Sequence, residues 1–160
     1  MLTTILFAAS LAVAAPPGSF RGHDFGDSCS QDAGLVKVGT EGEGIQQLTV
    51  YNEIEPKLNI GPVPLTSVSY SCWSDMLMMI MVRFDIDDGG TLYGILTEHW
   101  GKPVQDNQYI PDYTWMGTIF AQLEYAHRND SSLILIHGPL TQQWKTESKR
   151  EAASQASDDL

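Results

Sequence analysis

The sequence predicts a single α+β domain with one antiparallel sheet of about five strands, one helix packed across it and a polar C-terminal helix. Apolar residues alternate at 46–51, 65–72, 76–86, 113–125 and 132–137. Short turns join these runs, so successive strands should pair antiparallel. One stretch between them has the spacing of a helix, and residues 141–160 are polar and helix-prone.

Composition along the chain predicts four segments. Residues 1–14 are expected to be an export signal, because an apolar run precedes small residues and Pro16-Pro17; a buried N-terminal helix is the alternative. Residues 15–45 are rich in Gly, Asp and Ser and are expected to be mostly irregular. Residues 46–140 should form the α+β core, and residues 141–160 a polar helical tail.

The strongest predicted strand is 76–86. One face carries Met76, Met78, Ile80, Val82, Phe84 and Ile86, and the other carries Leu77, Met79 and Met81. A strand that is apolar on both faces is expected at the centre of the sheet, covered on both sides.

A helix is expected directly after this strand. Its apolar face would hold Leu92, Ile95, Leu96 and His99. Asp88 can cap its start, while Gly101 and Pro103 should end it.

Charge and cysteine content restrict the partners and the compartment. The formal net charge is −11, which argues against DNA, RNA or anionic lipid as a ligand. No segment after the export signal is long and apolar enough to span a membrane. The two cysteines, Cys29 and Cys72, predict a disulfide in an exported protein, so a periplasmic or secreted location is expected.

The familiar catalytic and metal-binding motifs are incomplete or missing. Asp85–Gly90 begins like a calcium loop, but the twelfth position is Leu96 where a glutamate is required. The histidines lack zinc-site spacing, and no Gly-x-Ser-x-Gly segment occurs. We therefore expect no catalytic residue, metal or cofactor, and favour a protein without enzymatic activity. His137, placed by the predicted hairpin near Glu124 or Gln122, and surface carboxylates leave a small secreted hydrolase as an alternative.

An aromatic segment provides the candidate binding site. Its predicted contact residues are Asp106, Tyr109, Asp112, Tyr113 and Trp115. Large rigid rings flanked by polar groups are typical of protein-binding surfaces. The alternative is that the later rings belong to a strand and pack into the core.

A set of short motifs resembles a group of small exported bacterial proteins of unknown function. The motifs are Phe20-Arg21-Gly22 with Gly26, Leu58–Gly61, Val68–Tyr70, Trp100-Gly101-Lys102-Pro103 and Tyr113–Gly117. The helix followed by Gly-x-Pro is also similar to modules of the outer-membrane assembly lipoprotein and of β-lactamase inhibitor protein. Neither resemblance implies catalytic residues.

The expected function is that of an exported binding or accessory protein of a bacterial envelope, whose partner is another envelope or secreted protein. The alternatives are the hydrolase and a secreted inhibitor or effector that docks through its aromatic loops.

Overall fold

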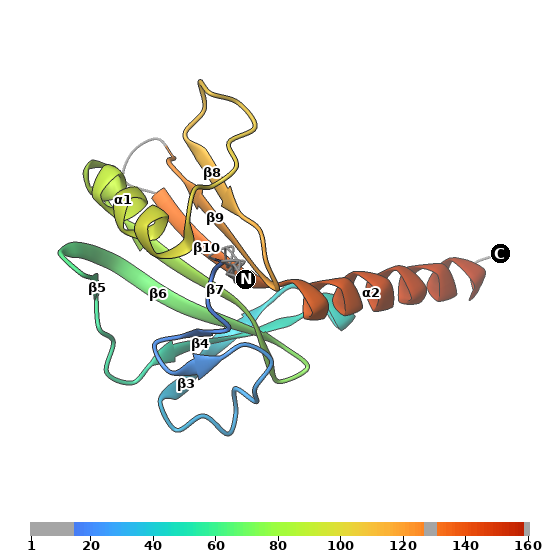
Figure 1. The fold of residues 1–160 in the computed structure, drawn as a ribbon. Coiled ribbons are helices and arrows are strands. Elements are labelled where there is room, and N and C mark those ends of the chain that lie inside the picture. The colour runs from blue at the N-terminus through green and yellow to red at the C-terminus, as the bar shows by residue number, and fades with distance from the viewer. Residues whose placement is uncertain (1–14, 127–130, 159–160) are drawn as a thin grey trace, which may run out of the picture.

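The computed structural model describes residues 15–126 and 131–158 and shows a mostly β protein (Figure 1). The predicted export signal, and Arg128–Asp130 of the predicted hairpin turn, lie outside the described residues. The strands are β1 Ser19–Phe20, β2 His23–Asp24, β3 Leu35–Glu41, β4 Leu48–Glu53, β5 Asn59–Ile60, β6 Val63–Trp73, β7 Met76–Phe84, β8 Asp112–Trp115, β9 Ile119–Glu124 and β10 Ser131–His137. The helices are α1 Gly89–Trp100 and α2 Gly138–Asp158, with short 3₁₀ turns η1 Gly44–Gln46 and η2 Ile86–Asp88.

The predicted α+β class with a five-strand sheet is wrong. The described strands form an eight-stranded antiparallel sheet in the order β3-β4-β6-β7-β10-β9-β8, with β5 paired to β6, and a separate two-stranded sheet of β1 and β2. Two segments account for much of the difference. Strand β3 forms within the region expected to be irregular, and residues 113–125 divide into β8 and β9 around an exposed turn at 116–118.

The sequence does not predict strand β3, because apolar and polar residues do not alternate clearly along it. Gly39 interrupts it, and its register against β4 shifts between Lys37 and Gly39. Only Leu35 of its seven residues is buried. The strand therefore owes its structure to backbone pairing with β4 rather than to an apolar face.

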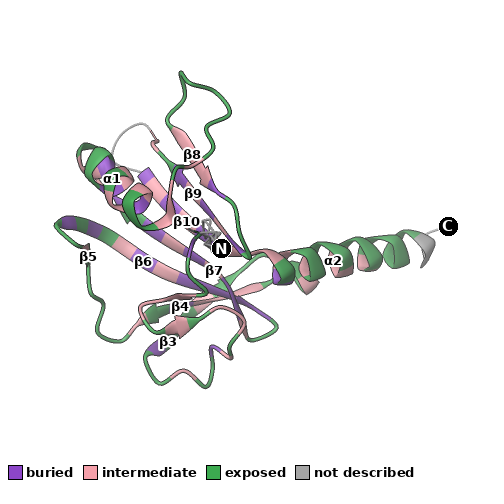
Figure 2. Ribbon diagram, viewed as in Figure 1, coloured by how far each residue is buried: buried purple, intermediate pink, exposed green. Residues whose placement is uncertain are grey.

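The inner face of the sheet carries the main core. Helix α1 packs there through Leu92 and Leu96. The core is filled by the inner residues of the central strands, chiefly Tyr70, Ile80, Val82, Phe84, Leu123, Leu133 and Leu135. Figure 2 shows this buried band running along the central strands beneath α1. Several residues predicted on the apolar faces of strand 76–86 and of the helix are not fully buried. Met76, Met79, Met81 and Ile95 are only partly buried, and Ile86 and His99 are exposed.

The outer face is covered mainly at one end. There the start of α2 places Leu140 and Trp144 against Trp73 and Met78. Beyond this contact α2 passes beside η1 and extends away from the sheet, with most of its residues exposed (Figures 1 and 2). Further along this face, Met81 of β7 and its register partner Ile134 of β10 are only partly buried. The second apolar face of β7 is therefore not completely covered.

Candidate functional site

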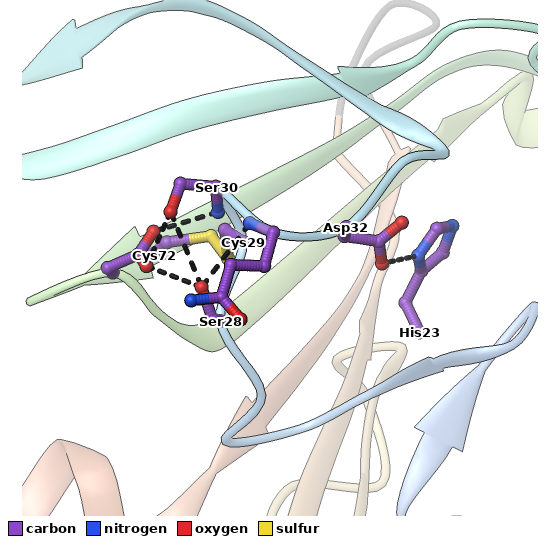
Figure 3. The surroundings of a disulfide bond; sticks show 8 residues. His23, Ser28, Cys29, Ser30, Asp32 and Cys72 are labelled. Carbon is purple, nitrogen blue, oxygen red and sulfur yellow. Dashed lines mark hydrogen bonds and ion pairs between the residues drawn. A yellow bond between two sulfur atoms is a disulfide. The ribbon is translucent and has the colours of Figure 1, made fainter.

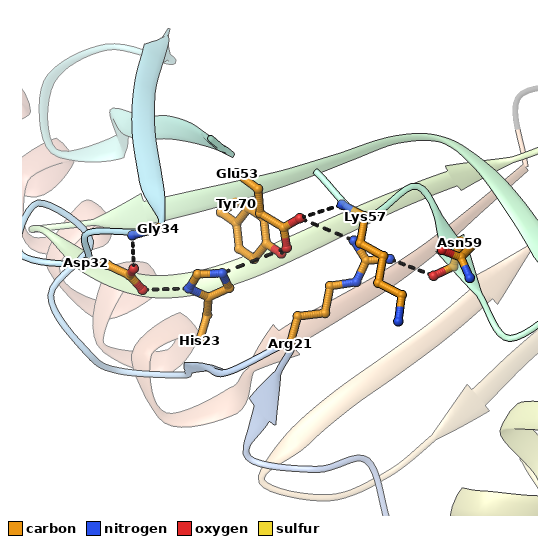
Figure 4. Close-up of polar contacts among 8 residues, drawn as sticks. All are labelled: Arg21, His23, Asp32, Gly34, Glu53, Lys57, Asn59 and Tyr70. Carbon is orange, nitrogen blue, oxygen red and sulfur yellow. Dashed lines mark hydrogen bonds and ion pairs between the residues drawn. The ribbon is translucent and has the colours of Figure 1, made fainter. Parts of the chain in front are cut away.

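A polar depression opens where the hairpin of β1 and β2 meets the end of β4. Its volume is about 670 Å³, and it is lined by Arg21, His23, Ala33, Gly34, Glu53, Ile54, Glu55 and Lys57. Figure 4 shows the side chains of Arg21, His23 and Glu53 converging at this point. These groups come from segments that are far apart in the sequence, so only the tertiary fold assembles them.

A tight turn directs Arg21 and His23 toward Glu53. Arg21 and Gly22 have φ values of 56° and 88°, as a two-residue hairpin with both central residues in the left-handed region requires. Arginine is disfavoured there, but contacts outside the turn hold its side chain. The guanidinium donates to the Asn59 carbonyl at 2.9 Å and lies 3.5 Å from a Glu53 oxygen.

The disulfide fixes the loop that carries the next site residue, Asp32. Cys29 and Cys72 are bonded, with their Cα atoms 6.6 Å apart, which confirms the predicted pairing (Figure 3). Beside the bond, Asp75 of the β6–β7 turn accepts hydrogen bonds from Ser28 and from both the amide and the hydroxyl of Ser30. These bonds hold the pKa of the Asp75 carboxyl below its ordinary value. The loop is therefore anchored covalently and by hydrogen bonds, three residues before Asp32.

A short polar contact joins His23 and Asp32 beside the depression. His23 Nδ1 lies 2.6 Å from Asp32 Oδ2, and the other Asp32 oxygen accepts the Gly34 amide at 2.8 Å. Burial raises the pKa of Asp32, but the bonds from His23 and Gly34 outweigh burial, so the pKa is lowered. An ionised carboxylate can only accept a hydrogen bond, so the proton in this bond belongs to His23 Nδ1. The other ring nitrogen, Nε2, lies 3.8 Å from Glu53 Oε1.

Glu53 is the most heavily bonded carboxylate of the depression. Tyr70 donates its hydroxyl to Oε1 at 2.5 Å, and the Lys57 amide donates to Oε2 at 3.2 Å. The Tyr70 ring also meets the His23 ring edge to face, with centroids 4.9 Å apart. Burial, followed by the bond to Glu53, raises the pKa of Tyr70, so the phenol keeps its proton and remains a donor.

This arrangement supports two kinds of chemistry. An imidazole oriented by a carboxylate through Nδ1 is the geometry of a general acid or base. The same bonds also attach the N-terminal hairpin to the sheet, because Arg21 and His23 belong to the hairpin while Glu53 and Tyr70 belong to the sheet. The site can therefore serve catalysis, or simply hold the hairpin in place.

Sequence reasoning missed this cluster because its members are distant along the chain. One signal could have found it. The predicted disulfide brings the segment containing His23 and Asp32 beside the strand containing Tyr70. Arg21 lies two positions before His23, so it is brought there as well. Glu53, at the end of β4, supplies the carboxylate that contacts Arg21 and Tyr70.

Two of the predicted binding residues lie on the surface of a loop. Tyr109 is 85% exposed and Asp106 is exposed, both between α1 and β8. Ile110, which is not among the predicted binding residues, follows Tyr109 and is 54% exposed. The loop therefore presents an aromatic and an aliphatic side chain together.

The other three predicted binding residues are held by the sheet. Trp115 is buried, and its indole N–H donates to the Gly101 carbonyl at 2.7 Å. Tyr113 is half-buried and packs on Tyr93, with ring centroids 4.5 Å apart. Asp112 accepts from the Gln122 amide at 3.1 Å. These residues support the base of the loop.

His137 does not lie beside Glu124. The register of β9 and β10 pairs His137 with Ile119, whereas Gln122 pairs with Ile134 and Glu124 with Ser132, farther along the strand. The His137 ring stacks at 6.3 Å from the Phe25 ring, and burial lowers its pKa. The predicted placement of His137 near Glu124 is therefore wrong.

Within residues 15–126 and 131–158, no group of three or more His, Cys, Asp or Glu side chains is arranged to hold a metal ion. No helix in the same ranges is both long and apolar enough to cross a membrane. The resemblance to exported bacterial proteins stays a prediction from short motifs. Neither a protein-family model nor a curated protein sequence nor a solved structure matches this chain.

Proposed function

We propose that this chain is an exported binding protein that docks on another protein through the loop of residues 104–111, called here the docking loop. The observation that carries the proposal is the exposure of Tyr109 and Ile110 side by side at its tip. Large apolar side chains grouped on the surface are typical of interaction sites.

The loop is held in shape before any partner binds. Val104 and Thr114 exchange two backbone hydrogen bonds, at 2.8 and 2.9 Å, which close its base. Near the tip, Asn107 accepts the amides of both Tyr109 and Ile110, each at 3.0 Å. A loop ordered in advance loses less conformational entropy on binding, so more of the contact energy contributes to affinity.

Export is supported by the Cys29–Cys72 bond, because structural disulfides persist mainly in oxidising compartments. The N-terminal apolar run is the second support. A bacterial envelope as the destination rests on the resemblance in motifs. The acidic charge favours a partner whose contact surface is basic around an apolar pocket.

Site-specific photo-crosslinking tests the docking loop. A benzophenone amino acid replaces Tyr109, and a control protein carries it at Val38, an exposed apolar residue of β3. Both proteins are irradiated with the secreted and envelope fractions of the producing cell. We expect a discrete adduct from position 109 that does not form from position 38.

Competition makes the result specific. Excess unlabelled wild-type protein should abolish the adduct, whereas the Tyr109→Ala/Ile110→Ala protein should not. Both side chains are exposed, so the melting temperature should stay unchanged. Equal competition by the two proteins would refute the docking loop.

A small hydrolase is the second candidate, and the His23–Asp32 geometry favours it. In this case His23 would transfer protons and Asp32 would orient it. Chromogenic nitrophenyl esters, phosphates and glycosides provide the assay, with His137→Gln as the matched control. Activity lost in His23→Gln and kept in His137→Gln would support the candidate, and absence of turnover in the wild-type protein would end it for these substrates.

A further inference from the structure

A second cavity, mainly apolar, adjoins the polar depression along the N-terminal hairpin. It has a volume of about 400 Å³ and is lined by Phe20, Ile60, Gly61, Pro62, Ile95, Leu96, His99, Trp100 and Leu133. Phe20 lines this cavity and its neighbour Arg21 lines the polar depression, so the hairpin borders both. The volume lies within the range of about 300–1,000 Å³ that small-molecule sites occupy.

The cavity has a buried floor and partly exposed walls. Leu96 and Leu133 are buried core residues that form its floor. Phe20, Ile95 and Trp100 are only half-buried, although they pack against the core. Apolar area is therefore left accessible at a site that the core already holds in shape, which is the usual condition for binding an apolar ligand.

The charge around this cavity differs from that of the whole chain. None of its lining residues is acidic, although the chain has a net charge of −11. His99 is exposed at the rim, and the Arg21 guanidinium carbon lies 5.1 Å from the centroid of the Phe20 ring. Arg21 is paired with Glu53 at 3.5 Å, but a guanidinium has five N–H donors, so it can still donate to an incoming anion.

We propose that this cavity binds a small amphipathic acid, a molecule with an apolar body and one anionic group. The body would lie on Leu96 and Leu133 and against the Trp100 ring. The anionic group would face the rim, toward Arg21 and His99. This proposal is independent of the docking loop, because residues 104–111 do not line the cavity.

A matched pair of fluorescent probes tests the proposal. 8-Anilinonaphthalene-1-sulfonate carries an anionic group, and N-phenyl-1-naphthylamine has the same apolar body without it. We expect both probes to bind the native, oxidised protein saturably with one site per chain, the anionic probe about tenfold more tightly. Equal affinities would refute the anionic preference, and failure of both probes to saturate would refute the cavity as a binding site.

Variants then locate the site. Ile95→Glu places a carboxylate on the cavity wall and should weaken both probes at least about tenfold, whereas Ile86→Glu, at an exposed isoleucine away from the cavity, should leave both unchanged. Arg21→Gln and His99→Gln should weaken the anionic probe and spare the neutral one. Should Ile95→Glu fail to fold, these two variants still decide the position of the anionic group. Binding by a folded Ile95→Glu protein at wild-type affinity would overturn the proposal.

Discussion

The Tyr125 hydroxyl donates a 2.7 Å hydrogen bond to the carbonyl of Gly89, the first residue of α1. Burial, followed by the neighbouring Tyr113 and Tyr93, raises the pKa of Tyr125 to about 12, so the hydroxyl keeps the proton it donates. This bond ties the end of β9 to the start of the helix. It also requires the ring to lie directly against the helix backbone.

The close approach of Tyr125 makes Gly89 intolerant of a side chain. A Cβ at Gly89 would lie 2.5 Å from Cε1 of the Tyr125 ring, whereas a Cβ at Gly90 would meet nothing within 4 Å. We expect Gly89→Ala to lower the free energy of unfolding by about 1–3 kcal/mol through overpacking. Gly90→Ala should be neutral or stabilise by up to about 1 kcal/mol. Urea unfolding measures both, and equal effects would contradict the contact.

The His23–Asp32 bond predicts an acid-sensitive part of the stability. The pKa of Asp32 is lowered in the folded chain, so its contribution is present above the unfolded value of 3.8 and is lost as the pH falls through the folded value. Asp32→Asn should therefore be destabilised relative to wild type at pH 6, and this difference should shrink below about pH 3.8. Urea unfolding across pH 2.5–6 gives the comparison.

Asp24→Asn is the control for the pH series, since Asp24 is an exposed carboxylate on the same hairpin. It should follow the wild-type profile. A difference between Asp32→Asn and wild type that stays constant from pH 6 to 2.5 would show that the carboxylate charge is not involved.

The disulfide should supply a large part of the stability. Cys29 and Cys72 are separated by 43 positions, and closing a loop of this length contributes about 4 kcal/mol in the chain-entropy model. We expect Cys29→Ser/Cys72→Ser to lose this amount in urea unfolding, and to become insensitive to reductant. The unfolded, unreduced wild-type chain should show no reactive thiol, and two thiols per chain would contradict the bond.

Phe84 should be among the most costly core positions. Its side chain is fully buried on β7, and its ring meets the Tyr125 ring edge to face with centroids 6.4 Å apart. Phe84→Ala should lower the free energy of unfolding by about 3–5 kcal/mol. Ile86→Ala, at an exposed position two residues later, should cost less than about 1 kcal/mol. Similar losses in the two variants would place β7 at the periphery.

Local patterns in the sequence determined several features correctly. Two cysteines in a chain expected to be exported allow one intrachain pairing, and the structure has that bond. The alternation along β7 identified Ile80, Val82 and Phe84 as buried because a strand turns every second side chain to the same face. Gly101, with φ of 79°, follows the last residue of α1, as expected from the conformational freedom of glycine.

Only the tertiary structure decided the strand count and the polar cluster. Strand β3 is held by pairing with β4, which leaves no periodic trace in its own residues. Trp115 is buried because its register places it opposite Ala121 on the core face, whereas Tyr109 is left outside the sheet. His23, Asp32 and Glu53 meet because a turn, a disulfide-anchored loop and a strand end converge in space. Side-chain periodicity is a property of neighbouring residues, while strand pairing and polar clusters depend on contacts between distant segments, whose formation no local pattern encodes.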